Sequence, residues 1–296
     1  MQVILLYATV VLIWGSTWSV IPFQLGVVAE ELSVAYRFGI AALFLYAYAL
    51  LSGRRIRLPT NAYPYVLLQG TLLFSLNYFL VYYATVHITS GLVAVLFSSI
   101  VLFNAILERA FFKTPFDRRL LLAGFLGLSG IGMIFWPEVS VISFEDNTII
   151  GIMLVLAATL IASFGNMTAV VNTRRDLPVV AVNAHAMAWS ALLSFAIAAM
   201  LGREFTFSFE RDYVISLAFL AVFGSAIAFG CYLALIQRIG PARAAYSSVL
   251  FPIVALAIST VVEDYNWTAI AAVGIILTLV GNWLILSDRT TKPKNI

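Results

Sequence analysis

Charged residues are scarce in this 296-residue chain. They make up 10% of the sequence, whereas roughly a quarter of the residues in a soluble domain are charged. Hydrophobic residues supply 62%, and the mean hydropathy is +1.00. This balance excludes a soluble fold. The chain is long enough for about ten membrane-spanning helices of roughly 20 residues each, which leaves little sequence for a separate soluble domain.

Cysteine and histidine are also too few to suggest a metal site or a catalytic cluster. Cys231 is the single cysteine, so it cannot form an internal disulfide. The two histidines, His87 and His185, lie far apart, and no His-Glu-x-x-His pattern occurs. We therefore expect no metal, no cofactor and no nucleic-acid partner, and we expect that the protein is not an enzyme.

Apolar runs long enough to cross a bilayer divide the chain into ten segments. Eight of the nine prolines fall at or between the ends of these runs, and only Pro252 lies inside one. No basic segment precedes the first run, so we expect it to be retained as a helix. The sequence predicts an all-α polytopic membrane protein with helices at about 3–22, 33–52, 63–84, 89–109, 119–136, 149–170, 179–201, 213–236, 242–262 and 267–287.

Lysine and arginine are sorted between the connections of these predicted helices. The bases on one side are Arg54, Arg55, Arg57, Arg109, Lys113, Arg118, Arg119, Arg174, Arg175, Arg238, Arg243, Arg289, Lys292 and Lys294. The alternate connections are rich in glutamate and aspartate, with Arg203 and Arg211 as their only bases. The positive-inside rule then places both termini in the cytoplasm of a multi-pass inner-membrane protein.

A stretch of fifty residues, Tyr83–Gly132, returns without a gap as Tyr232–Gly281. Both copies follow the same plan of apolar helix, glycine loop, helix with Ser-Ser, turn and glycine-bearing helix. We therefore predict two five-helix repeats, 1–138 and 147–296, within one integral membrane domain. Because five is odd, the second repeat is inverted, and substrate sites of such proteins lie near the midplane between the repeats.

Short motifs occur at four places: Trp14-Gly15-Ser16, Arg37-Phe38, Leu250-Phe251-Pro252 with Glu263 eleven positions on, and Gly281. They resemble the drug/metabolite transporter superfamily in its ten-helix EamA form, and within it most of all the bacterial aromatic amino-acid exporters. The resemblance implies a central cavity surrounded by the first four helices of each half, with the last helix of each half outside it. The first half departs from the pattern, because Phe103 and Thr114 stand where Pro252 and Glu263 have their counterparts.

Polar and aromatic side chains at membrane depth are the candidate substrate-binding groups, because polar groups there are costly unless they face a cavity or a partner. Those in the first and third helices are Trp14, Thr17, Trp18, Asn77, Tyr78 and Tyr82. An interfacial aromatic belt is the alternative for Trp18 and Tyr82, which are near the outer end. Trp14 and Tyr78 are nearer mid-depth, where a cavity wall is favoured.

The paired serines of the two repeats form a second group of candidates. They are Ser98, Ser99, Ser247 and Ser248, with Tyr246 beside the second pair. Each serine can instead bond back to its own helix. Pro252 lacks a backbone N–H, so it predicts a kink and a free Ser248 carbonyl that could accept an ammonium group. Pro252, Gly91 and Gly240 are the predicted gating and kink positions.

Three further polar residues have both a functional and a structural interpretation. Asn166 has the repeat position of Thr17 and either contacts substrate or holds two helices together. His185 is a candidate substrate contact, although a lone histidine is more often a packed, hydrogen-bonded residue. Arg37 is explained without a transport role, by snorkelling or by a pair with Glu30 or Glu31.

These features predict an inner-membrane exporter of small amphipathic metabolites, above all aromatic and other neutral amino acids. It would work by alternating access, as a monomer in the lipid bilayer. Efflux of nucleosides or drugs is the alternative within the class, and a membrane-embedded enzyme or a scaffold is the alternative outside it. All fourteen acids fall at or beyond helix ends. We therefore predict facilitated export without obligatory proton exchange, with His185 as the remaining titratable candidate.

Overall fold

The computed structural model describes residues 2–114, 118–136, 146–262 and 268–286, and every regular element in these ranges is helical. The α-helices are α1 (Gln2–Thr17), α2 (Glu30–Leu51), α3 (Tyr63–Gln69), α4 (Asn77–His87), α5 (Ser90–Phe97), α6 (Ile100–Phe112), α7 (Arg118–Ile134), α9 (Asp146–Arg174), α10 (Val179–Met200), α11 (Arg211–Ala221), α12 (Ala228–Ile239), α13 (Pro241–Ala245), α14 (Phe251–Val262) and α15 (Ala269–Leu286). The 3-10 segments are η1 (Ile21–Gln24), η2 (Thr60–Ala62) and η5 (Tyr246–Leu250), and the π-helical segments are η3 (Gly70–Leu76) and η4 (Val222–Ile227).

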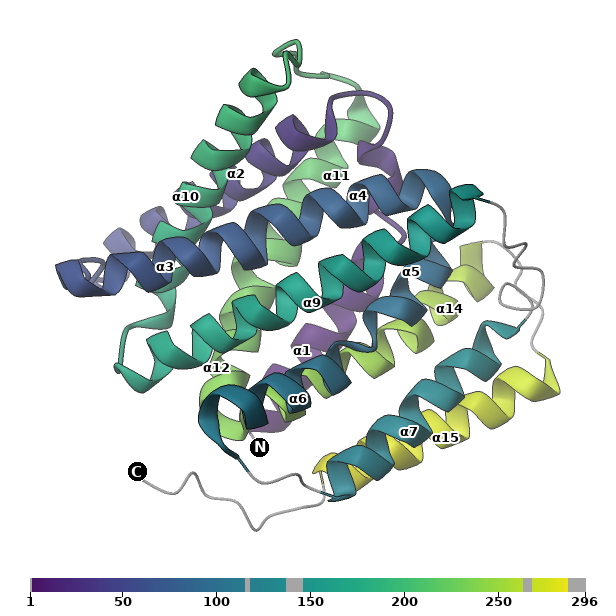
Figure 1. The fold of residues 1–296 in the computed structure, drawn as a ribbon. Helices are drawn as coiled ribbons and strands as arrows, with labels where there is room; N and C mark the ends of the chain where they lie inside the picture. The colour runs from purple at the N-terminus through teal and green to yellow at the C-terminus, as the bar shows by residue number, and fades with distance from the viewer. Residues whose placement is uncertain (1, 115–117, 137–145, 263–267, 287–296) are drawn as a thin grey trace.

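Helices long and apolar enough to cross a membrane make up most of the structure (Figure 1). Six such helices occur in the described ranges: Glu30–Leu51, Thr60–His87, Leu92–Phe112, Asn147–Arg174, Val179–Met200 and Arg211–Ile239. Gln2–Thr17 and Ala269–Ile285 are shorter apolar helices. The all-helical membrane fold is therefore confirmed. Each predicted range overlaps a helix or a run of joined helical segments, whereas the number of membrane crossings stays a prediction.

The first helix is shorter than predicted. The α-helix ends at Thr17, and η1 begins at Ile21 with Pro22 as its second residue. Proline has no N–H to donate to a carbonyl four residues earlier, so an α-helix cannot retain its full hydrogen bonding up to this point. Trp18 therefore follows the end of α1 and does not lie inside the helix.

Two long helices contain a π-helical segment that the sequence did not predict. η3 joins α3 to α4, and η4 joins α11 to α12. Within each, a serine bonds to the carbonyl five residues earlier: Ser75 Oγ to Gly70 O over 3.5 Å, and Ser225 Oγ to Leu220 O over 2.9 Å. A π-turn widens the helix and frees carbonyl groups for other donors, and such turns are frequent at functional sites.

Two helices, α7 and α15, pack against each other at the lower edge of the molecule in Figure 1. Their backbones approach closely at Gly130 and Gly274, where a Cβ atom on Gly130 would lie 2.4 Å from Gly274 O. No larger residue fits there without moving a helix. Small residues allow this kind of contact in membranes, where van der Waals packing holds helices together.

Candidate functional site

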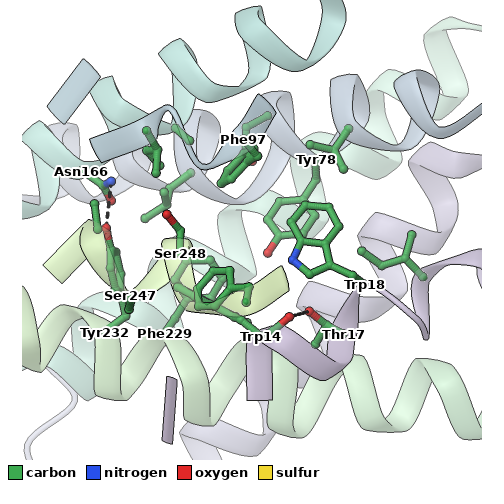
Figure 2. Close-up of a pocket in the computed structure, with 18 of the residues that line it drawn as sticks. Trp14, Thr17, Trp18, Tyr78, Phe97, Asn166, Phe229, Tyr232, Ser247 and Ser248 are labelled. Carbon is green, nitrogen blue, oxygen red and sulfur yellow. Dashed lines mark hydrogen bonds between the residues drawn. The ribbon is translucent and has the colours of Figure 1, made fainter. Parts of the chain in front are cut away.

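One cavity receives side chains from both halves of the chain and encloses about 710 Å³ of empty space, counted out to its open mouth (Figure 2). The lining residues are Trp14, Thr17, Trp18, Ile21, Arg37, Leu73, Asn77, Tyr78, Val81, Phe97, Ile100, Ala162, Asn166, Phe229, Tyr232, Ala245, Ser247, Ser248 and Phe251. None of these belongs to α7 or α15, so the pair lies outside the cavity wall.

An aromatic cluster around Trp14 forms one wall. The Trp14 ring centroid is 4.7 Å from that of Phe229, 5.0 Å from Tyr232 and 5.8 Å from Phe251. The first and third contacts are edge-on, a geometry that aromatic rings prefer over face-to-face stacking. Trp18 lies apart from this cluster, 6.0 Å from the Phe97 ring centroid. The wall therefore offers ring faces and edges from helices of both halves.

The Trp14 ring is held in place by the π-helix η4. Its indole N–H donates a 2.9 Å hydrogen bond to the carbonyl of Gly224, within η4. The space is tight, because a Cβ atom on residue 224 would lie 3.0 Å from Thr17 Cγ2 and 3.3 Å from Arg37 Nη2. A glycine at position 224 therefore leaves room for the side chains of Thr17 and Arg37.

Arg37 is the one charged side chain in the cavity lining, and it is buried with 1% of its surface exposed. Its Nε donates to Ser225 Oγ over 2.9 Å, and its guanidinium lies over the Tyr78 ring, 4.7 Å from the centroid. Its Nη1 has no hydrogen-bond partner among the described residues.

Contrary to expectation, Arg37 neither snorkels nor forms a salt bridge with Glu30 or Glu31 in the described structure. Glu31 instead accepts from Tyr83 and forms a salt bridge of 3.2 Å with Arg203. Glu31 is thus engaged by a tyrosine and a second arginine, and the Arg37 side chain is directed into the protein and not along the lipid face. The sequence held a signal for this, because no acid lies three or four residues from Arg37 on its own helix.

A chain of amide hydrogen bonds lies at another part of the cavity. Asn166 Nδ2 donates to Tyr232 OH over 3.1 Å and to Asn104 Oδ1 over 3.4 Å, and Asn104 Nδ2 donates to Pro241 O over 3.3 Å. Figure 2 shows the Asn166–Tyr232 bond at the cavity wall. Asn166 Oδ1 is buried without a donor in the described part of the chain. Asn166 therefore holds helices together with its N–H₂ group and keeps an acceptor free.

Ser247 and Ser248 line the cavity, whereas the equivalent pair of the first half does not. Ser247 Oγ bonds to Ala244 O over 2.8 Å, and Ser248 Oγ has no partner among the residues described. Ser98 and Ser99 bond back to their own helix, to Ala94 O over 2.8 Å and to Leu96 O over 2.6 Å.

The predicted free carbonyl at Ser248 is not present. Pro252 is the second residue of α14, and the preceding segment, η5, is a 3-10 helix. The Ser248 carbonyl accepts the N–H of Phe251 instead of a bond from residue 252, and it lies 3.4 Å from Ser98 Oγ. The chain therefore changes its helix type at the proline, and the tighter 3-10 turn supplies the missing donor.

Three other predicted site residues lie outside the cavity wall. Tyr82 is fully buried. Tyr246 is also buried and donates to Ala123 O on α7, so its ring faces away from the cavity. His185 Nδ1 lies 2.9 Å from Ala181 O, and its ring packs edge-on against Tyr46 and Tyr63 at 5.5 Å. A substrate-binding role for these three stays a prediction.

The predicted gating glycines differ in their surroundings. Gly240 has a φ of 82°, a left-handed conformation that favours glycine, and it separates α12 from α13. Gly91 lies in the first turn of α5, but its surroundings are not among the described features of the structure. Glu263 lies outside the described residues.

Sequence reasoning missed four aromatic residues of the wall and gave Arg37 no transport role. The aromatic residues are Phe97, Phe229, Tyr232 and Phe251. Phe251 was already part of a motif and Tyr232 part of the repeat, but neither pattern shows which face of a helix meets a cavity. Eight predicted site residues line the cavity: Trp14, Thr17, Trp18, Asn77, Tyr78, Asn166, Ser247 and Ser248.

Comparison with known proteins gives one family and several relatives. The sequence profile of the EamA-like transporter family matches residues 1–136 and again residues 149–287. The uncharacterized inner membrane transporter YedA of Escherichia coli (strain K12) is 28% identical over 293 residues, which cover 95% of this chain and 92% of that protein. Protein PagO of Salmonella typhimurium (strain LT2) is 21% identical over 290 residues, 96% of this chain and 93% of PagO.

A solved crystal structure shares the fold. It matches with a TM-score of 0.76 at 16% sequence identity, covering 95% of this chain and 94% of the other. At this identity the match concerns the arrangement of helices only.

Proposed function

The chain belongs to the EamA-like transporter family, and we propose that it exports small amphipathic metabolites, above all aromatic and other neutral amino acids. It is a multi-pass inner-membrane transporter by its family, its helices and its relatives. The proposal adds the substrate class, the outward direction and alternating access as the mechanism.

The observation that carries the proposal is the pairing of an aromatic wall with unpartnered polar atoms in one cavity. Four buried polar atoms of the lining have no hydrogen-bond partner among the described residues: Arg37 Nη1, Asn77 Oδ1, Asn166 Oδ1 and Ser248 Oγ. Buried polar atoms are nearly always paired, so an unpaired atom in a cavity wall lacks a partner that a ligand would supply. The set contains donors and acceptors, as the charged ends of an amino acid require, and the Trp14 cluster suits an aromatic side chain.

Two inverted five-helix repeats with ten crossings are part of the proposal. The family profile matches the chain twice, in 1–136 and in 149–287. The two π-helical segments support the same division, because each joins two parts of a long helix and holds a serine, Ser75 or Ser225, that bonds to the carbonyl five residues earlier. The cavity lies between helices of both halves, where rocking of one half against the other would expose it alternately. One chain supplies the whole lining, and a monomer with cytoplasmic termini is part of the proposal.

The alternatives are less well supported by the cavity. A cationic drug needs an acid nearby, whereas the described lining contains none and carries the positive charge of Arg37. A membrane enzyme needs a reactive constellation, and the described residues hold no group of three His, Cys, Asp or Glu residues able to bind a metal. Transport of a neutral or zwitterionic metabolite fits the residues better than either.

Flux measurement in proteoliposomes tests the proposal. Vesicles that contain the purified protein and are loaded with radiolabelled phenylalanine or tryptophan should release the label faster than protein-free vesicles. Unlabelled amino acid outside the vesicles should accelerate this release by exchange. Nucleosides and cationic dyes should compete poorly. Exchange of a nucleoside or a dye without any amino-acid flux would rule out the assignment.

A further inference from the structure

We propose that Arg37 binds the carboxylate of the transported substrate, so that the cavity accepts an aromatic metabolite with a carboxylate and rejects the corresponding amine. This inference rests on the proposed function in one respect: the cavity described above is the transport site. It assigns a chemical role to a residue for which the sequence predicts only snorkelling or a pair with Glu30 or Glu31.

The position of Arg37 is the first argument. The residue lies in α2 seven positions after its first residue, about 10 Å along the helix at roughly 1.5 Å per residue. The hydrocarbon half-thickness is only about 15 Å. An arginine keeps its charge in a protein. A charge at this depth is costly, and such residues usually pair with an acid or face a substrate pathway.

No acid lies within salt-bridge distance of Arg37 among the residues that the structure describes. Glu31, in the first turn of the same helix, forms its salt bridge with Arg203 instead. Within the described ranges, the guanidinium donates from Nε to Ser225 Oγ, and the buried hydroxyl of Tyr82 lies close to it. A neutral hydroxyl does not neutralise a positive charge, so the guanidinium remains a charged donor in a cavity wall.

The orientation of the guanidinium is fixed before any substrate arrives. Ser225 holds Nε, and the Tyr78 ring supports the cation at 4.7 Å. These contacts leave Nη1 without a partner. The planar fork of arginine suits a carboxylate, with parallel N–H···O bonds, and pre-orientation reduces the entropy lost on binding.

The other unpartnered atoms suit the opposite end of a zwitterion. Asn77 Oδ1, Asn166 Oδ1 and Ser248 Oγ can each accept an ammonium N–H. None of these three carries a charge, so they do not compensate for the repulsion between Arg37 and an amine that lacks a carboxylate. Selection therefore depends on the carboxylate more than on the ammonium group.

Three probes with the same ring separate these requirements: phenylalanine, 3-phenylpropanoate, which lacks the ammonium, and phenethylamine, which lacks the carboxylate. Binding is measured as the ligand-induced shift in melting temperature of the detergent-purified full chain, and transport as competition with labelled phenylalanine in proteoliposomes. Phenylalanine and 3-phenylpropanoate should both bind, and phenethylamine should not. Arg37→Gln should weaken the first two by about 10- to 100-fold, the effect expected of a lost bond to a charged group.

Arg37→Lys and Arg175→Gln are the matched variants. Lysine keeps the charge without the fork, so Arg37→Lys should retain part of the preference for carboxylates. Arg175 also lies over a tyrosine ring, 4.0 Å from the Tyr65 centroid, but it is exposed and outside the cavity. Arg175→Gln should therefore give the same response to each of the three probes as the unmodified protein, with no binding of phenethylamine.

The unliganded melting temperatures distinguish binding from folding. Replacing an unpaired buried charge with a neutral amide should leave the melting temperature of Arg37→Gln equal to or above that of Arg37→Lys. A lower value for Arg37→Gln, with an unchanged ratio among the three probes, would show a structural role and overturn the inference. Equal binding of phenylalanine and phenethylamine would also overturn it while leaving amino-acid export intact. Binding and transport of none of the three would overturn the proposed function and the inference together.

Discussion

The indole N–H of Trp14 donates to the carbonyl oxygen of Gly224 over 2.9 Å, across 210 positions of the chain. A helix near the start of the chain and a π-helical segment near its end thus fix one cavity wall together. Any motion that opens the cavity by moving these elements apart must break or shift this bond. The Trp14 ring is therefore a candidate contact for the substrate, and its bond to Gly224 depends on the relative position of α1 and η4.

Removing the Trp14 ring should affect large substrates most. Trp14→Ala should weaken binding of tryptophan by about 1 kcal/mol or more, because aromatic contacts contribute this much beyond their buried area. Alanine transport should change less. Tyr78→Ala should likewise weaken binding of tryptophan more than binding of alanine. Competition of unlabelled amino acids with labelled phenylalanine gives the affinities. Trp283→Ala is the control, since Trp283 is 66% exposed on α15, outside the cavity; equal losses for alanine and tryptophan in Trp14→Ala would indicate a folding defect.

The hydroxyl of Tyr232 should matter through Asn166. Tyr232→Phe removes the acceptor of the 3.1 Å bond and leaves a buried amide N–H with only the 3.4 Å bond to Asn104. We expect a loss of about 1–3 kcal/mol in the free energy of unfolding, the usual effect of an unsatisfied buried donor. Thermal unfolding in detergent measures it, with Tyr65→Phe on the exposed surface as control. An unchanged melting temperature would mean that water replaces the hydroxyl.

Pro252→Ala should slow transport without destabilising the protein. The new N–H at residue 252 can donate to the Ser248 carbonyl, so η5 can continue as an α-helix into α14. Turnover in exchange assays should fall while substrate affinity holds. Pro64→Ala, in the first turn of α3, tests whether any proline replacement has this effect. Turnover equal to that of the unmodified protein would show that the change of helix type at Pro252 plays no part in transport.

The predicted topology is testable by cysteine labelling. In a Cys231→Ser background, single cysteines at positions 54, 119, 175 and 292 should react with a membrane-impermeant thiol reagent only from the cytoplasmic side. These positions carry Arg54, Arg119, Arg175 and Lys292, which the positive-inside rule places together. A position that reacts only from the periplasm would break the ten-helix count.

Transport should not require proton exchange through His185. Its ring packs between Tyr46 and Tyr63 and bonds within its own helix, outside the cavity lining. His185→Ala should therefore keep its amino-acid flux. Liposomes with an imposed pH gradient and a clamped membrane potential should show no accumulation against the amino-acid gradient. Uphill accumulation that His185→Ala abolishes would make this histidine the coupling site.

Hydropathy and proline were sufficient to locate the helices. Lipid excludes any unpaired backbone, so an apolar run of sufficient length must be helical, and Pro59, Pro178 and Pro241 mark places where a helix begins. The π-helical segments were not predictable from period alone, since the serines that bond within them, Ser75 and Ser225, occur in ordinary apolar sequence.

The cavity was predicted only in part because the face of a helix depends on its neighbours. Trp14 and Tyr78 were expected at the wall and line it, whereas Tyr246 is turned toward α7 by its bond to Ala123 O. Arg37 shows the same limit: charge and depth were visible in the sequence, but its bond to Ser225 joins positions 188 residues apart. A contact between positions so far apart in the chain leaves no recognisable pattern in the sequence around either residue.

The close approach of Gly130 to Gly274 constrains how the protein is made. About 135 residues separate the end of α7 from the start of α15. At roughly 5–20 residues per second of synthesis, α7 waits on the order of ten seconds in the membrane before its partner emerges. During this interval its glycine face is covered by lipid or by another helix. A chain that ends before Ala269 lacks α15, so the glycine face of α7 in a truncated product stays without the helix that packs on it.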